Sequence, residues 1–189
     1  MYMFPPRNPD LKPERIWSYE LAFSHSTAGG RPSYGINLFY IDGENLILRV
    51  PVDGRPMNIN TGRIENAGVE AQIAWRISAA WSADANYSYL HMEHPVLAAP
   101  AHKLYAGASF TAKRWSASTG VQYVAGLYKS LDPAATEDFV LWNVRAAFRA
   151  AHWLEIWVRG ENLLAQEYEI NAGFPMPKAT VTAGVRMNF

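Results

Sequence analysis

The chain has 189 residues, of which 49% are hydrophobic and 13% aromatic, and its formal net charge is zero. Zero net charge argues against nucleic-acid binding through bulk electrostatics, and the absence of cysteine excludes disulfides and thiolate metal sites. The mean hydropathy of −0.15 is too low for helical membrane spans, each of which needs about 20 consecutive apolar residues.

The first ten residues do not have the basic stretch followed by an apolar stretch that marks a secretory signal. Their prolines, among them Pro5, Pro6 and Pro9, are typical of a surface loop. We therefore expect the chain to open in a loop and to be the C-terminal part of a longer polypeptide.

Nine segments carry strand-type residues, and most have the length that a tilted strand needs to cross a bilayer, about 9 to 11 residues or slightly more. They span 16–25, 34–43, 63–75, 81–93, 103–111, 115–124, 139–149, 154–162 and 178–189. Several alternate strictly, so that one face of the strand is apolar and the other polar. In the third segment Val69, Ala71, Ile73 and Trp75 oppose Glu70, Gln72 and Ala74. The eighth is less clear, because Trp157 falls between Glu155 and Arg159.

The last segment ends on an aromatic residue with strict alternation behind it. Val181, Ala183, Val185, Met187 and Phe189 fall on one face, and polar residues fall on the other. Such an ending is typical of an outer-membrane β-barrel, whose closing strand turns its apolar face to lipid.

Short and long connections alternate along the chain. The short ones are expected at 26–31, 77–80, 112–114 and 150–153, and the long ones at 44–62, 94–102, 125–138 and 163–177. Up-and-down membrane barrels have short periplasmic turns and longer extracellular loops. The pattern predicts an all-β, antiparallel up-and-down transmembrane barrel segment with a periplasmic C-terminus, and the strand parity places Met1 outside the cell.

Aromatic residues gather where two interfacial girdles would lie. Trp75, Trp81, Trp115 and Trp153 lie beside the short turns, whereas Phe39, Tyr40, Tyr87, Tyr89 and Tyr123 lie toward the long loops. The polar faces, which we expect to line a wet interior, carry Glu70, Gln72, Asp84, Asn86, Gln122, Asn143, Arg145, Arg159 and Arg186.

Four motifs in order resemble those of the TonB-dependent outer-membrane receptors. Asn8-Pro-Asp-Leu-Lys-Pro-Glu14 with Trp17-Ser-Tyr-Glu-Leu21 resembles the stretch that opens a late barrel strand. Asn60-Thr-Gly62 with Gly68-Val-Glu70, and Gly160-Glu-Asn-Leu-Leu164 with Glu167-Tyr168, resemble two further family signatures. Gly173-Phe-Pro-Met-Pro177 with Phe189 resembles the family's ending, although Lys178 stands where Gly and then Arg are usual. The stretch 168–177 looks most like receptors from Bacteroidota.

The resemblance implies that residues 1–189 are about nine strands of a 22-stranded barrel, without the plug domain and the first thirteen strands. It implies energised uptake of a scarce nutrient, most naturally an iron–siderophore complex, with cobalamin, haem or an oligosaccharide open. The implied partners are outer-membrane lipid, the remainder of the receptor, the nutrient or metal chelate, and the TonB–ExbB–ExbD coupler acting through the plug. We expect no resident cofactor and a Gram-negative outer-membrane location. The chain is then either a truncated gene product or one piece of a split receptor.

Candidate ligand contacts are placed in the long loops. Tyr128, Lys129, Tyr168 and Phe174 combine a cation with aromatic rings, which suits an anionic iron chelate. His91, His94 and His102 surround one loop and are a second candidate, for haem or metal, because histidine ligates both. The competing interpretation is a solvated loop bent by Pro95 and Pro100.

Catalysis finds little support. The sequence has no nucleophile elbow, HExxH motif, P-loop or dinucleotide fingerprint. Ser24 and His25 are adjacent, but neighbouring strand residues face opposite ways. Two other interpretations remain: a small passive porin or structural barrel, and a soluble β-sandwich binding module with core aromatics.

Overall fold

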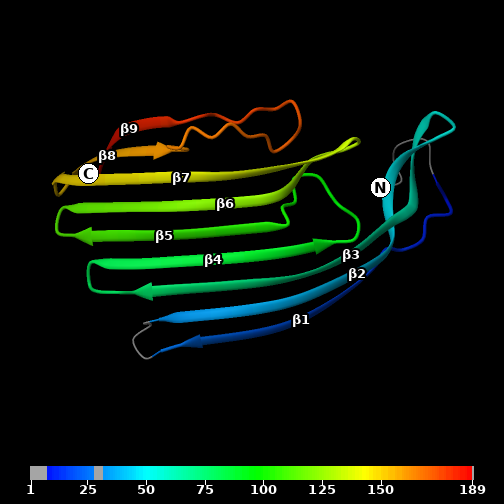
Figure 1. Cartoon of the computed structure of the whole chain (residues 1–189), viewed down its shortest axis with the longest axis horizontal. Coiled ribbons are helices and arrows are strands. Elements are labelled where there is room, and N and C mark those ends of the chain that lie inside the picture. The colour runs from blue at the N-terminus through cyan, green and yellow to red at the C-terminus, as the bar shows by residue number, and fades with distance from the viewer. Residues whose placement is uncertain (1–7, 28–31, 189) are drawn as a thin grey trace.

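The computed structural model of the chain describes residues 8–27 and 32–188, so Met1 and Phe189 lie outside the described part. It contains a single antiparallel sheet of nine strands in sequential order, β1 to β9, each hydrogen-bonded to the next (Figure 1). The strands are β1 Arg15–Ser26, β2 Ser33–Val52, β3 Arg55–Arg76, β4 Trp81–Met92, β5 His102–Ala112, β6 Trp115–Leu131, β7 Ala134–Ala151, β8 Leu154–Glu161 and β9 Thr180–Met187.

The sheet is an open piece of up-and-down wall with two edge strands. Within residues 8–27 and 32–188, no backbone pairing joins β1 to β9. No helix in this part of the chain has the length and apolarity needed to cross a membrane. The nine-stranded antiparallel architecture predicted from the sequence is confirmed.

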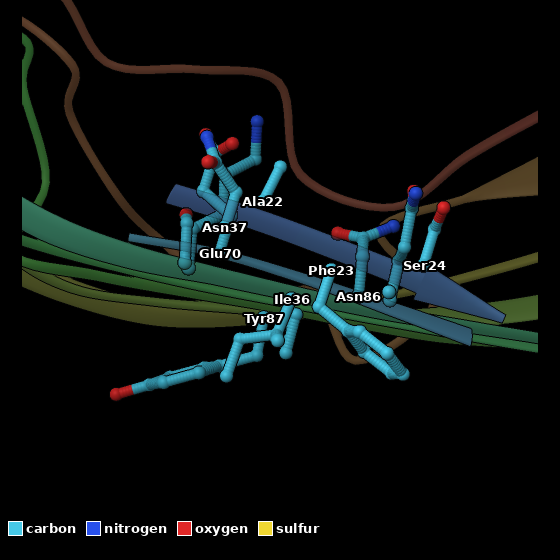
Figure 2. Close-up of a pocket in the computed structure, with 13 residues that line it drawn as sticks. Ala22, Phe23, Ser24, Ile36, Asn37, Glu70, Asn86 and Tyr87 are labelled. Carbon is cyan, nitrogen blue, oxygen red and sulfur yellow. The ribbon is translucent and has the colours of Figure 1, made fainter. Parts of the chain in front are cut away.

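The register gives the sheet one apolar and one polar face. Phe23 pairs with Ile36, which pairs with Ala71, and Ala71 pairs with Tyr87, so these four share one face. Figure 2 shows Phe23, Ile36 and Tyr87 on one side of the ribbon and Ala22, Ser24, Asn37, Glu70 and Asn86 on the other. Large apolar side chains remain exposed across the first face, including Leu21 at 70% and Val185 at 59%. A soluble domain would bury these side chains, whereas a bilayer covers such a face.

Two of the four expected long loops are instead hairpin strands. β2 and β3 pair up to a turn at Asp53–Gly54, and β6 and β7 pair up to Asp132–Pro133, so the expectation of loops at 44–62 and 125–138 was wrong. The reason is turn chemistry: Asp53 and Gly54 have φ values of 50° and 74°, the left-handed pair that closes a tight hairpin. Register shifts occur after Gly43 in β2 and after Val124 in β6. They separate the regular part of each strand from its extension into the hairpin. These hairpins and the connections at 93–101 and 162–179 lie at one end of the sheet, and the short turns after β3, β5 and β7 lie at the other (Figure 1).

The segment 8–14, the first of the family-like motifs, is hydrogen-bonded to the β2–β3 hairpin. The amide of Asn60 donates to the carbonyls of Lys12 and Asn45, at 2.9 and 2.6 Å, and its Oδ1 accepts from the Lys12 N–H at 2.7 Å. Glu14 Oε1 accepts a hydrogen bond from the Ile47 N–H at 2.8 Å, directly beside the register shift. Asn60 and Glu14 therefore bind irregular backbone that the sheet ladder leaves unpaired.

The aromatic girdles expected from the sequence are present, except at Phe39. Trp81 lies against Phe110 and Trp115 against Phe148 near the short turns, with ring centroids 4.9 and 4.6 Å apart. Phe39, expected in the other girdle, lies instead on the polar face and covers Gly68. The ambiguous Trp157 also lies on the polar face, where its indole covers Gly184. Glycine has no Cβ, so each of these rings can lie flat on the backbone of the next strand.

Candidate functional site

The connection at 162–179 folds onto the end of the β6–β7 hairpin. Asn162, only 5% exposed, donates from its side-chain amide to the carbonyls of Gln166 and Pro177, at 2.9 and 3.1 Å. Its Oδ1 accepts from the Gln166 N–H at 3.0 Å, and its own N–H donates to Asn143 Oδ1 at 2.9 Å. Both ends of the long connection are thus held by one buried side chain, a role that the sequence analysis missed.

Lys129 and Tyr168, two of the predicted ligand contacts, come together at this end. Lys129 Nζ lies 2.5 Å from Glu137 and 3.4 Å from Glu169. The Tyr168 ring packs on Phe139, 4.1 Å between centroids, beside the small buried cluster of Val124 and Leu127. Lys129 and Tyr168 line one open cavity of about 300 Å³ together with Glu137, Glu167, Glu169, Pro175, Met176 and Lys178.

The other two predicted contacts lie apart from this cavity. Phe174 is 72% exposed, near the tip of the same connection. The carbonyl of Tyr128 accepts a hydrogen bond from the Ala98 N–H at 2.9 Å, which places Tyr128 beside the 93–101 connection. The four residues therefore share the long-loop end of the sheet without forming a single cluster.

Ion pairs and partial burial shift the pKa values of three side chains at this end of the sheet. The hydrogen bond to Glu137 raises the pKa of Lys129, against an opposing effect of partial burial, and Glu169 adds to the rise. Burial raises the pKa of Tyr168, with a further contribution from the charge of Glu161. A hydrogen bond from Lys178 lowers the pKa of Glu167. The ammonium of Lys129 is therefore shared between two carboxylates.

The three histidines occupy separate positions. His102 Nδ1 lies 2.8 Å from Tyr87 Oη, and the His102 ring lies 5.0 Å from that of Tyr89 on the apolar face. His91 lies 4.0 Å from Glu93, and both side chains are well exposed. Among the described residues no group of three His, Asp or Glu side chains is placed to hold a metal ion, so His91, His94 and His102 do not form one.

Ser24 and His25 do not form the start of a catalytic set. Ser24 lies with the polar side chains (Figure 2), whereas the His25 ring lies beside that of Tyr34 on the apolar face, with ring centroids 5.3 Å apart. The geometry agrees with the alternation that the sequence predicts.

The polar face forms a shallow groove over β1 to β5. It holds about 430 Å³ and is lined on this side by hydroxyl, amide and charged groups: Ser24, Asn37, Glu70, Gln72, Asn86, Ser88 and Lys103 (Figure 2). The Oδ1 atoms of Asn37 and Asn66 are buried with no hydrogen-bond partner among the described residues. A polar inner face and a wide apolar outer face define a wall segment of an outer-membrane type β-barrel.

The comparisons with known proteins agree with this class. The family model described as "TonB dependent receptor-like, beta-barrel" matches residues 1–186. The chain therefore belongs to the TonB-dependent receptor family, within its β-barrel part, and this is a family of transport receptors rather than enzymes.

Individual relatives are distant. An iron-regulated outer membrane virulence protein of Vibrio cholerae serotype O1 is 25% identical over an alignment 155 residues long, which covers 70% of this chain and 24% of that protein. The FrpB iron transporter from Neisseria meningitidis has a TM-score of 0.77 at 16% identity, covering 95% of this chain and 32% of that chain. The copper transporter OprC has a TM-score of 0.75 at 17% identity, covering 96% and 32%. The chain thus spans about a quarter to a third of the length of these relatives.

Proposed function

We propose that the chain forms the C-terminal barrel wall of an outer-membrane receptor that takes up a ferric siderophore by energised transport. The observation that carries the proposal is the family match over residues 1–186, together with structural relatives that are named as an iron transporter and a ferric-catecholate import receptor. The exposed apolar face supports contact with outer-membrane lipid, and the polar face supports contact with a plug that completes the receptor. The transport energy would come from the TonB–ExbB–ExbD coupler acting on that plug, and the C-terminus would be periplasmic.

The ligand would be bound at the end of the sheet where the long connections lie. We place Tyr128, Lys129, Tyr168 and Phe174 among the contacts, and Phe174 presents the most accessible ring. An anionic chelate would compete with Glu137 and Glu169 for the Lys129 ammonium. This competition favours a ligand with several oxygen donors over a single carboxylate.

A copper ligand is a second candidate, because one structural relative is a copper transporter. Iron is preferred here because several structural relatives are named as ferric-chelate receptors, and the Vibrio cholerae relative is named as iron-regulated. Haem, cobalamin and oligosaccharides are further alternatives.

The test is uptake of radiolabelled ferric siderophores, in parallel with labelled copper, by cells that carry the complete receptor containing these strands. We expect iron uptake that disappears in a host without TonB. Phe174→Ala should weaken uptake affinity about tenfold, whereas Leu97→Ala, an exposed residue of another connection, should leave it unchanged. Uptake of neither metal, or uptake that persists without TonB, would overturn the proposal.

A further inference from the structure

The connections at the two ends of the sheet carry opposite charge. Those at the long-loop end hold five acidic residues and one lysine, and they span 53–54, 93–101, 132–133 and 162–179. The described turns at the other end hold Lys113, Arg114 and His152 and no carboxylate, and they span 77–80, 113–114 and 152–153 (Figure 1). Although the chain as a whole is neutral, the short-turn end therefore has a local excess of positive charge.

The cations of this end are concentrated in the β5–β6 turn. Lys113 and Arg114 are the two residues of that turn, and both are exposed. Neither forms an ion pair with a carboxylate of residues 8–27 or 32–188. The Arg149 N–H donates to the Arg114 carbonyl at 2.8 Å, which brings a third cation alongside. Glu155, the cross-strand partner of Arg149, forms its ion pairs with two other arginines.

The β5–β6 turn is fixed in place and holds a lysine where another residue would suit the backbone better. The Thr111 N–H donates to the Ala80 carbonyl at 2.8 Å, which ties the end of β5 to the preceding turn. Lys113 has a φ of 52°, a left-handed conformation that glycine or asparagine adopts at lower cost. Unfavourable backbone conformations of this kind are found preferentially at functional sites. The lysine therefore points to a use for its charge at the tip of this hairpin.

A tryptophan follows each of the three described turns directly. Trp81 begins β4, Trp115 begins β6, and Trp153 immediately precedes β8. Trp81 and Trp115 lie on the apolar face, where they are 49% and 57% exposed. In a membrane barrel, exposed indoles near the strand ends lie at the interface between hydrocarbon and headgroups. Because Lys113 and Arg114 directly precede Trp115, their charges lie at the level of the lipid headgroups.

We propose that Lys113 and Arg114 bind the phosphate of an anionic phospholipid, of the phosphatidylglycerol type, in the leaflet at the short-turn end. The guanidinium group presents two parallel N–H donors to phosphate oxygens, and the ammonium group adds a compact charge. The indole of Trp115 supplies apolar surface for the glycerol and the first part of an acyl chain. This assignment rests on the proposed function, which places the apolar face in a bilayer, and it adds a specific lipid class to that contact.

A lipid is a better occupant than a protein segment because the two cations border the exposed apolar face of the sheet. A phospholipid can fill both environments at once, with its phosphate at the turn and its acyl chains on that face. The missing carboxylates also favour a lipid with net negative charge, since the ammonium of a zwitterionic headgroup would find no partner in the turn. The attraction takes place at an exposed site and is therefore weakened by salt.

The test uses the complete receptor containing these strands, purified in detergent. Native mass spectrometry measures binding of dioleoylphosphatidylglycerol, with dioleoylphosphatidylcholine as the zwitterionic control. We expect the first phosphatidylglycerol to bind at least about fivefold more tightly than phosphatidylcholine. Lys113→Asn/Arg114→Gln should weaken phosphatidylglycerol binding about tenfold, and its asparagine retains the left-handed turn.

Three further variants separate a specific site from bulk charge and from misfolding. Lys113→Arg/Arg114→Lys keeps both charges and should bind within about twofold of the parent. Arg49→Gln/Arg55→Gln removes the same charge from the β2–β3 hairpin at the opposite end, and it should also bind within about twofold. Arg114→Gln alone leaves residue 113 untouched and should weaken binding about threefold. The heat-dependent gel migration of each variant reports whether its barrel is folded.

Equal affinity for the two lipids, or equal weakening by the variants at the two ends of the sheet, would overturn the proposal. Binding of sn-glycerol 3-phosphate as tight as that of the lipid would do so as well, because the membrane would then be unnecessary. Tighter binding of an acetylated and amidated tetraglutamate peptide, lost in Lys113→Asn/Arg114→Gln, would assign the turn to an acidic protein partner instead. None of these measurements involves transport, so their failure is distinct from a failure of iron uptake by the complete receptor.

Discussion

The side-chain amide of Asn162 donates a hydrogen bond to the carbonyl of Pro177, 3.1 Å away across a connection that returns to the sheet. The same side chain also donates a hydrogen bond to the Gln166 carbonyl and accepts one from the Gln166 N–H. Asn162 has a φ of 49°, a conformation that asparagine adopts more readily than most residues. One residue therefore ends β8 and closes the loop that follows.

Asn162→Gly should destabilise the protein by about 1–3 kcal/mol, because it keeps the backbone conformation and removes three side-chain hydrogen bonds. Asn162→Ala should cost about 1 kcal/mol more, since alanine is strained at positive φ. Urea unfolding gives the free energies, and hydrogen exchange at 163–177 locates the loss. Asn171→Ala, on the exposed part of the same connection, is the control and should change little. Equal exchange in parent and Asn162→Gly would contradict this account.

The Tyr105 ring lies over Gly107 and Gly120 on the polar face. A Cβ at Gly120 would be 2.7 Å from Tyr105 Oη, closer than packed atoms allow. We expect Gly120→Ala to destabilise by about 1–3 kcal/mol through overpacking. In a Tyr105→Ala background the same change should cost much less, because the obstructing ring is gone. An unchanged cost in that background would show that the ring is not the cause.

Alternation and the order of the motifs allowed most of the fold to be predicted. Val69, Ala71 and Ile73 lie on the apolar face as expected, because a strand period of two fixes facing once the strand is recognised. Period alone could not place Trp157, since a polar-facing tryptophan depends on Gly184 of the next strand. The extensions of the β2–β3 and β6–β7 hairpins were not predicted, because apolar and polar residues do not alternate regularly in these segments.

The candidate site was less accessible to sequence reasoning. Lys129 was identified from its place in a loop, but its two carboxylate partners come from β7 and from residue 169. Arg145 and Arg159 are direct partners across β7 and β8, and this pairing depends on the strand register, which carries no local sequence signal. A sequence signal for Asn162 did exist, because it stands in a family-like motif before a long connection.

A charge placed on the apolar face of β6 should destabilise the protein much more than a charge placed on its polar face. Val121, 41% exposed, lies on the apolar face between Ala106 and Trp142, and Gln122 lies on the polar face. In lipid vesicles Val121→Arg should destabilise by about 2–4 kcal/mol, the cost of an arginine near the middle of a bilayer. Gln122→Arg makes the matched control and should cost under about 1 kcal/mol. Unfolding free energies that fall equally for both variants would argue against lipid contact at Val121.

The contact between Lys129 and Glu169 should break at alkaline pH. The pKa of Lys129 is raised in the folded protein, chiefly by its hydrogen bond to Glu137, relative to about 10.4 in an unfolded chain. A raised pKa contributes stability that is fully present below the unfolded value and is lost as pH rises through the folded value. We therefore expect cleavage of 163–177 by proteinase K to accelerate several-fold above about pH 10.4. Lys129→Arg keeps its charge there and should show no such step, whereas Lys129→Met should be cleaved quickly at every pH. A step at the same pH in the parent chain and in Lys129→Arg would assign the transition to another group.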